Sequence, residues 1–219
     1  MPRTRRHIHA GTVYHVHNRG NERARIFNND NDYRGYLGLM EEAAVRVPMR
    51  VVGFSLMPNH VHLLLWPEDD GAVSAYMKWL TGTHALQHRF RSVSVGTGHV
   101  YQGRFKCHAV QTEGYYYTCL NYIEGNASRA GLVTRAEYWP WSSLFERIHG
   151  GNILSDGPLS LPGNWVDIVT AGPGAEQLQE LRACARGSRP YGTPEWVEQA
   201  VASHHLLPPP LPRGRPKRR

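Results

Sequence analysis

Two histidines with one apolar residue between them begin an otherwise hydrophobic segment of the chain. They are His60 and His62, in the sequence Met57-Pro58-Asn59-His60-Val61-His62. Side chains alternate between the two faces of a strand, so both imidazoles of a strand would leave one face about 7 Å apart. Two imidazoles on one face form a partial ligand set for a metal ion. For this pair alone, ordinary hydrogen-bonded strand histidines are the alternative.

A phenol and a carboxamide lie one helical turn apart later in the chain. Tyr122 and Asn126 share a face of a helix predicted from Thr112 or Glu113 to about Asn126. If this face covers the histidines, a divalent ion would meet two imidazole nitrogens and one amide oxygen, with positions open for a phosphate. Tyr122 would then lie beside a polarised phosphorus, and a neighbouring metal ion or basic charge would have to favour its phenolate. Taken singly, each residue has an ordinary explanation, a packed aromatic and a helix end.

The histidine spacing occurs a second time, at His15 and His17. This pair lies on a predicted strand over residues 12–18 and leads directly into the polar loop Asn18-Arg19-Gly20-Asn21. Because no apolar run follows, we expect a structural or DNA-contacting role for the pair. The alternative is that His15 serves the first pair as an auxiliary group, since the two strands would be neighbours.

The charge of the chain favours a polyanionic partner. The net charge is +7 and the isoelectric point is about 9.5, with basic clusters at residues 3–6 and 213–219. Arg104, Lys106 and His108 alternate with apolar residues on a predicted strand over 104–110, so one face would present cations to a phosphate. A solvated sheet face is the alternative. The other candidate DNA-binding residues are Arg19, Arg23, Arg25 and Arg129, with Tyr14 or Tyr101 to stack on bases.

Cysteine usage and hydropathy restrict the class of protein. The three cysteines, Cys107, Cys119 and Cys184, lack zinc-type spacing, and their odd number argues against a disulfide framework. No segment approaches the roughly 20 apolar residues of a membrane span, and no signal-peptide pattern follows the basic N-terminus. We therefore expect a soluble, cytoplasmic protein without a membrane partner.

The predicted elements alternate in the order β-α-β-β-α-β. This order indicates an α+β fold with a ferredoxin-like antiparallel sheet, in which the first and third strands lie at the centre. An added helix carries Tyr122. We expect a catalytic domain over 1–145 and a C-terminal extension over 146–219 that is partly irregular and partly helical. The predicted elements are strands 12–18, 51–57, 60–66 and 104–110, helices 30–47, 72–90, 112–126 and 175–186, a helix from 193, loops over 150–174 and an extended tail after 208.

Six segments occur in an order that matches a known family. The ordered set resembles the single-tyrosine HUH transposases with an IS200-like domain, and more narrowly the bacterial REP-associated tyrosine transposases, over roughly residues 8–145. The segments are Tyr14-His15-Val16 with Asn18-Arg19-Gly20-Asn21, Met57-Pro58-Asn59-His60-Val61-His62-Leu63-Leu64, Tyr101-Gln102-Gly103-Arg104-Phe105-Lys106, Tyr122-Ile123-Glu124, Arg129-Ala130-Gly131-Leu132-Val133 and Trp139-Pro140-Trp141-Ser142-Ser143.

This resemblance implies an enzyme that cuts and rejoins hairpin-bearing, REP-like single-stranded DNA. It implies that His60, His62 and Asn126 hold Mg²⁺ or Mn²⁺, and that Tyr122 forms a 5′-phosphotyrosine while a 3′-hydroxyl is released. It also implies a monomer associated with the bacterial nucleoid, with a dimer as the alternative. Departures occur at Gly125 and Ala127, where the family usually has a larger residue and proline. Since glycine costs a helix up to about 1 kcal/mol relative to alanine, we expect a looser turn at Asn126.

Two other functions compete with a transposase. A hairpin-binding protein with the same fold would bind DNA without cutting it. A phosphodiesterase that uses water would cut DNA without forming a protein adduct. The presence of His60, His62, Tyr122 and Asn126 together favours the transposase.

Overall fold

Four strands form one antiparallel sheet in the order β2-β3-β1-β4 in the computed structural model, which describes residues 8–91 and 98–204. The central strands are β1 (Val13–Arg19) and β3 (His60–Pro67), and the edge strands are β2 (Met49–Met57) and β4 (Lys106–Val110). The predicted α+β, ferredoxin-like arrangement is confirmed. The strand with the first histidine pair is therefore hydrogen-bonded on both sides.

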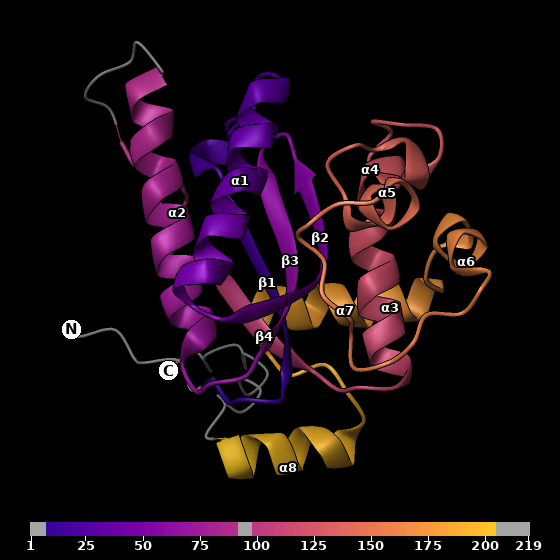
Figure 1. Ribbon diagram of the computed structural model, residues 1–219. Helices are drawn as coiled ribbons and strands as arrows, with labels where there is room; N and C mark the ends of the chain where they lie inside the picture. Colours follow the sequence, from indigo (N-terminus) through magenta and orange to yellow (C-terminus); the bar gives the residue numbers. More distant parts are fainter. Residues whose placement is uncertain (1–7, 92–97, 205–219) are drawn as a thin grey trace, which may run out of the picture.

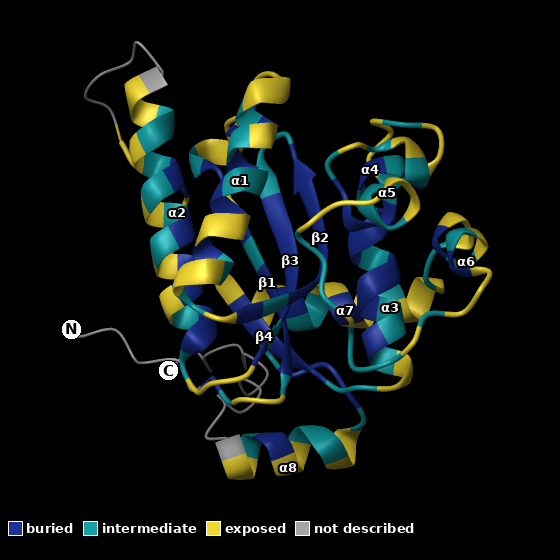
Figure 2. Ribbon diagram, in the orientation of Figure 1, coloured by how far each residue is buried: buried dark blue, intermediate teal, exposed yellow. Residues whose placement is uncertain are grey.

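Helices α1 (Asp30–Arg46) and α2 (Ala72–Arg91) cover one face of the sheet (Figure 1). The side chain of Asn29 caps α1 by accepting hydrogen bonds from the backbone N–H groups of Asn31 and Asp32. Alternate residues of the central strands point into this layer, among them Tyr14 and Leu63. Figure 2 shows that the strands between the helical layers are buried.

The other face of the sheet is covered by α3 (Gly114–Glu124), the helix that carries Tyr122. Its residue Leu120 packs against Gly53, at an irregularity in the register of β2. A Cβ atom at position 53 would overlap with the Cδ1 atom of Leu120. The missing side chain at Gly53 therefore lets α3 lie close to the sheet.

The end of α3 is fixed by the buried carboxylate of Glu124. Its Oε1 atom accepts hydrogen bonds from Ser143 Oγ at 2.6 Å and Arg147 Nε at 2.9 Å, and its Oε2 atom accepts one from Trp165 Nε1 at 2.6 Å. Ser143 and Arg147 belong to α5 (Ser143–His149), and Trp165 begins α6 (Trp165–Ala171). These bonds hold the turn that contains Tyr122 to the rest of this layer.

Some element boundaries differ from those predicted. The helix expected to reach Asn126 ends at Glu124, because Gly125 has non-helical torsions (φ −81°, ψ 7°) and separates α3 from α4 (Asn126–Arg129). Helix α6 lies within 150–174, where we expected only loops. The basic clusters and the tail lie outside the described residues. The remaining elements are η1 (Asn21–Arg23), η2 (Ala136–Tyr138), α7 (Ala175–Gly187) and α8 (Pro194–His204), the last two as predicted.

Candidate functional site

The structure brings His60, His62, Tyr122 and Asn126 together in one groove of about 600 Å³. The imidazoles come from β3, the phenol from α3 and the carboxamide from the first residue of α4. The ring centres of His60 and His62 are 5.0 Å apart, and the ring of Tyr122 lies edge-on to His62 at 5.6 Å. The break at Gly125 does not separate Asn126 from Tyr122, since both side chains line the groove.

His60 and His62 each have the Nδ1 atom of the ring in contact with a neighbouring polar atom. Nδ1 of His62 lies 2.8 Å from Nε2 of His15, and Nδ1 of His60 lies 2.6 Å from Oδ1 of Asn59. Histidines that bind metals usually have their second ring nitrogen held in this way, which fixes the orientation of the ring. Nε2 of each ring is then the atom left for an ion. The carboxamide of Asn126 would bind a cation through its oxygen, and two imidazole nitrogens with one amide oxygen fit a divalent cation.

The environment keeps these imidazoles neutral, which is the form that binds metal ions. Burial, followed by the charges of Arg19 and His17, lowers the pKa of His60 to about 4. Burial, followed by the neighbouring histidines and Arg129, also lowers the pKa of His62 well below its usual value. Near neutral pH, both candidate ligand histidines are therefore unprotonated.

The second histidine pair is also part of this site. His15 is fully buried and its Nε2 atom lies 2.8 Å from Nδ1 of His62, so this residue is not placed to contact DNA. The position fits both the structural role that we expected and the alternative of an auxiliary group. His17 lines the groove, with its ring centre 5.6 Å from that of His62 and its Nε2 atom 3.3 Å from the carbonyl oxygen of Ala185. His108, expected to contact DNA, is 3% exposed and lies edge-on to His15 at 4.8 Å. Its burial contradicts that expectation.

Basic side chains surround the groove. Arg19, Arg104 and Lys106 line it, as expected for residues that contact phosphates. The sequence analysis missed Arg182 and Arg186, which line it from α7 within the C-terminal extension. They are four residues apart on a helix that the sequence did predict, so their shared face was the available signal.

Several other predicted DNA contacts lie elsewhere. Arg23 and Arg25 are exposed but do not line the groove. Tyr14 and Tyr101 are buried and cannot stack on bases, because the hydroxyl of Tyr14 accepts a hydrogen bond from His9 N and that of Tyr101 pairs with His84 Nδ1. Tyr14 is directed inward by the alternation along β1, and Tyr101, which precedes β4, is enclosed by the same core.

Arg129 faces Tyr122 and not the groove. Its Cζ atom lies 4.8 Å from the centre of the phenol ring, and its Nη2 atom donates to the carbonyl oxygen of Tyr122. Burial lowers the pKa of Arg129 to about 10, still well above neutral pH. The sequence analysis did not predict this contact with the candidate nucleophile.

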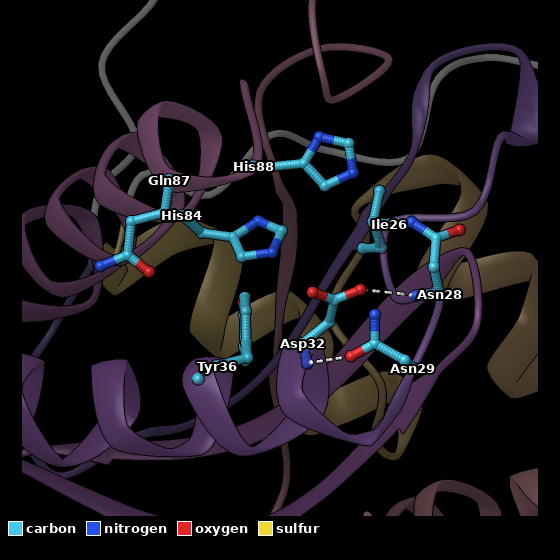
Figure 3. Close-up of a pocket in the computed structure, with 9 residues that line it drawn as sticks. Ile26, Asn28, Asn29, Asp32, Tyr36, His84, Gln87 and His88 are labelled. Carbon is cyan, nitrogen blue, oxygen red and sulfur yellow. Dashed lines mark hydrogen bonds between the residues drawn. The ribbon is translucent and has the colours of Figure 1, made fainter. Parts of the chain in front are cut away.

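A smaller cavity of about 120 Å³ lies on the opposite face of the sheet, between α1 and α2. Figure 3 shows His84 and His88 extending toward the carboxylate of Asp32. Within residues 8–91 and 98–204, no group of three or more His, Cys, Asp or Glu side chains is placed to hold a metal ion. The candidate ligand set in the larger groove, His60, His62 and Asn126, consists of two such side chains and one amide.

Comparison with known proteins identifies the family. A family model described as "Transposase IS200 like" matches residues 9–126, more than half of the chain. The chain belongs to the IS200-like transposase family. Tyrosine transposases cleave and rejoin DNA, so the enzyme class expected from the sequence is confirmed. The match contains the histidine strand, Tyr122 and Asn126.

One relative and one solved structure are similar to the chain over most of their own length. The REP-associated tyrosine transposase of Escherichia coli (strain K12) is 22% identical over 178 residues, which cover 80% of this chain and 96% of that protein. The structure of a REP-associated tyrosine transposase bound to a REP hairpin matches with a TM-score of 0.53 at 19% identity. That match covers 74% of this chain and 96% of the other, and it supports the common fold. Members of the family generally depend on a metal ion.

In the part of the chain that the structure describes, none of the helices of this transposase has the length and apolar character needed to cross a membrane.

Proposed function

We propose that this transposase cuts and rejoins hairpin-bearing single-stranded DNA through a covalent 5′-phosphotyrosine at Tyr122. The observation that carries the proposal is the groove in which the phenol of Tyr122 lies beside His62, with His60 and Asn126 lining the same groove. The solved relative bound to a REP hairpin supports the class of DNA. We infer a REP-like hairpin as the substrate of this chain.

His60, His62 and Asn126 would hold the divalent cation through two Nε2 atoms and an amide oxygen. When bound, the cation supplies Lewis-acid polarisation of the scissile phosphate. Imidazole ligands favour Mn²⁺ over Mg²⁺. His15 and Asn59 orient the two ligand rings, which limits the rearrangement needed when an ion binds.

Tyr122 would attack the phosphorus through its phenol oxygen. The new bond joins this oxygen to phosphorus, the bond from phosphorus to the 3′ oxygen breaks, and the 3′ oxygen gains the proton that the phenol loses overall. A second 3′-hydroxyl can reverse the step by displacing the tyrosine. The phosphodiester bond energy is kept in the adduct, so rejoining needs no nucleotide cofactor.

The rim of the groove would bind the DNA backbone. Positive charge near a scissile phosphate offsets the charge of the phosphates and stabilises the charge that develops during attack. The cations on the rim and the candidate ion ligands come from one chain, which supports a monomer as the acting form. In the proposed division, the domain over 1–145 supplies the nucleophile and the ion ligands, and the extension over 146–219 adds further cations. The rim residues are Arg19, Arg104, Lys106, Arg182 and Arg186.

A trapping experiment tests the function. The protein is incubated with a hairpin-bearing oligonucleotide and Mn²⁺ and then analysed on a denaturing gel. We expect a protein–DNA adduct that Tyr122→Phe abolishes and Tyr115→Phe retains, because Tyr115 lies on the same helix but packs against Tyr191. Binding without cleavage would identify a hairpin-binding protein instead. Cleavage without an adduct would identify a phosphodiesterase that uses water.

A further inference from the structure

The turn between α3 and α4 folds a guanidinium group back onto the candidate nucleophile. Arg129 lies seven residues after Tyr122, and its Cζ atom is 4.8 Å from the centre of the phenol ring. Its Nη2 atom also donates to the backbone carbonyl oxygen of Tyr122. One side chain therefore contacts both the ring and the backbone of the same residue.

The space for this guanidinium exists because residue 125 is glycine. A Cβ atom at Gly125 would lie 2.5 Å from Nη1 of Arg129, well inside van der Waals contact. The φ angle of Gly125 is −81°, which any residue can adopt, so the backbone does not require glycine here. The absence of a side chain at Gly125 leaves the room that the Arg129 side chain occupies.

The surroundings of Arg129 indicate that the phenol ring is its main partner. Its Nε and Nη1 atoms are buried without a hydrogen-bond partner, and the described residues place no carboxylate in an ion pair with it. Arg182, which also lowers the pKa of Arg129, carries a charge of the same sign. Removing a guanidinium from water costs free energy, and cation–π attraction to an aromatic face offsets part of that cost.

We propose that Arg129, in the space left by Gly125, is a positioning residue that holds the ring of Tyr122 for attack. This role rests on the proposed function of Tyr122 as nucleophile. The guanidinium restrains one face of the ring, while His62 and His15 lie edge-on to it at 5.6 Å and 6.1 Å. Because Arg129 does not line the groove, it acts through Tyr122 and not on the DNA.

Two substitutions disturb this contact in different ways. Gly125→Ala keeps every charge and pushes the guanidinium away from the ring. Arg129→Gln keeps the glycine and removes the cation. Gly114→Ala is the matched control on α3, because a Cβ atom there meets nothing within 4 Å.

For each variant, we would measure the affinity for hairpin DNA in EDTA and the single-turnover rate of adduct formation at saturating DNA with Mn²⁺. A shift of about 1 Å in a reacting group can cost on the order of 100-fold in rate. We expect Gly125→Ala and Arg129→Gln to lower the rate by about tenfold or more and the affinity by less than about twofold. Gly114→Ala should match the wild type in both.

A second measurement does not depend on activity. In protein labelled with ¹³C-tyrosine, the ring signal of Tyr122 is the one that disappears in Tyr122→Phe. We expect this signal to shift in Gly125→Ala and Arg129→Gln and to stay in place in Gly114→Ala. An unchanged signal in both test variants would show that the ring is not held by Arg129.

The other outcomes separate this inference from the function on which it rests. A wild-type rate in Gly125→Ala and Arg129→Gln would overturn the positioning role and leave the nucleophile intact. An equal loss of rate and affinity in Arg129→Gln alone would make Arg129 a DNA contact. If the wild type forms no adduct, the proposed function fails and the role of Arg129 fails with it.

Discussion

At the scale of single residues, the proposed metal site pairs a candidate ligand, His62, with a buried neighbour. His15 holds the Nδ1 atom of His62 at 2.8 Å from its own Nε2 atom. The sequence gives both residues the same spacing motif, so the motif alone did not distinguish a ligand from its support. The difference arises because His15 lies beneath His62, between β3 and β4, where the groove does not reach it.

Replacement of His15 by leucine should weaken metal binding while it preserves the fold. Loss of a partner that orients a ligand typically costs about 10- to 100-fold in metal affinity, and we expect a loss in this range for Mn²⁺. Titration followed by electron paramagnetic resonance measures it directly. The control is His108→Leu, which removes another buried histidine of the same face and should bind Mn²⁺ like the wild type. Equal losses in both variants would rule out a specific role for His15.

The buried imidazoles also predict how the stability of the metal-free protein depends on pH. Burial lowers the pKa of His60 and His17 to about 4 and that of His108 to about 3, and it lowers those of His15 and His62 well below the usual value. The unfolded chain, with histidine pKa values near 6.5, therefore binds more protons below that pH. The free energy of unfolding should therefore be highest above about pH 6.5 and should decrease as the pH falls toward about 4.

Urea unfolding in EDTA between pH 7.5 and 4.5 measures this loss. Each histidine that titrates only on unfolding contributes a slope of up to about 1.4 kcal/mol per pH unit. His108→Leu removes one such group, so its unfolding free energy should decline less steeply than that of the wild type. Parallel curves for the two proteins would show that His108 titrates alike in the folded and unfolded states.

At the scale of elements, periodicity predicted the sheet, the two helices on its far face and the helix that carries Tyr122. These elements have strong alternation or helical stripes, together with stops such as Pro48, which follows the end of α1 at Arg46. The looser turn expected from Gly125 is a break between α3 and α4. The inward turn of Arg129 was not predicted, because it depends on contacts between side chains. The approach of α7 to the groove was also missed, since packing of distant segments leaves no local pattern.

The position of α3 on the sheet depends on a glycine whose role only the structure shows. Gly53→Ala should destabilise the protein by about 1–3 kcal/mol, because the new methyl group overlaps with the buried Leu120. Gly38→Ala is the matched control on α1, where a Cβ atom meets nothing within 4 Å, and it should gain up to about 1 kcal/mol. Urea unfolding at constant pH gives both values. A stable Gly53→Ala variant would contradict the close approach of α3.

At the scale of the whole molecule, positive charge is placed around one groove. A second groove of about 880 Å³, lined by Lys78 of α2, shares Asn18, Gly103 and Arg104 with the first. A nucleic-acid strand that passes from one groove to the other would cross Arg104. The composition predicted a polyanionic partner, but it could not predict where such a path would lie, because the two grooves form only in the folded chain.

Arg104 should therefore contribute to the salt dependence of DNA binding. A protein that loses one phosphate contact shows a slope of log affinity against log salt that is smaller by about one. We expect this change for Arg104→Gln and none for Arg46→Gln, because Arg46 lies on α1 and stacks on Trp79. Fluorescence anisotropy with a hairpin oligonucleotide at several salt concentrations measures both slopes. An unchanged slope in Arg104→Gln would place the DNA elsewhere.

The central claim is that one ion bound by His60 and His62 lies within reach of the phenol of Tyr122 at a DNA phosphate. The most direct measurement is anomalous diffraction from crystals of the protein with Mn²⁺ and hairpin DNA that carries a non-cleavable linkage at the scissile position. We predict a manganese peak that both imidazoles and the amide oxygen of Asn126 coordinate, with the phenol oxygen of Tyr122 facing the phosphorus. A peak elsewhere, or a Tyr122 ring turned away from the phosphate, would contradict the account.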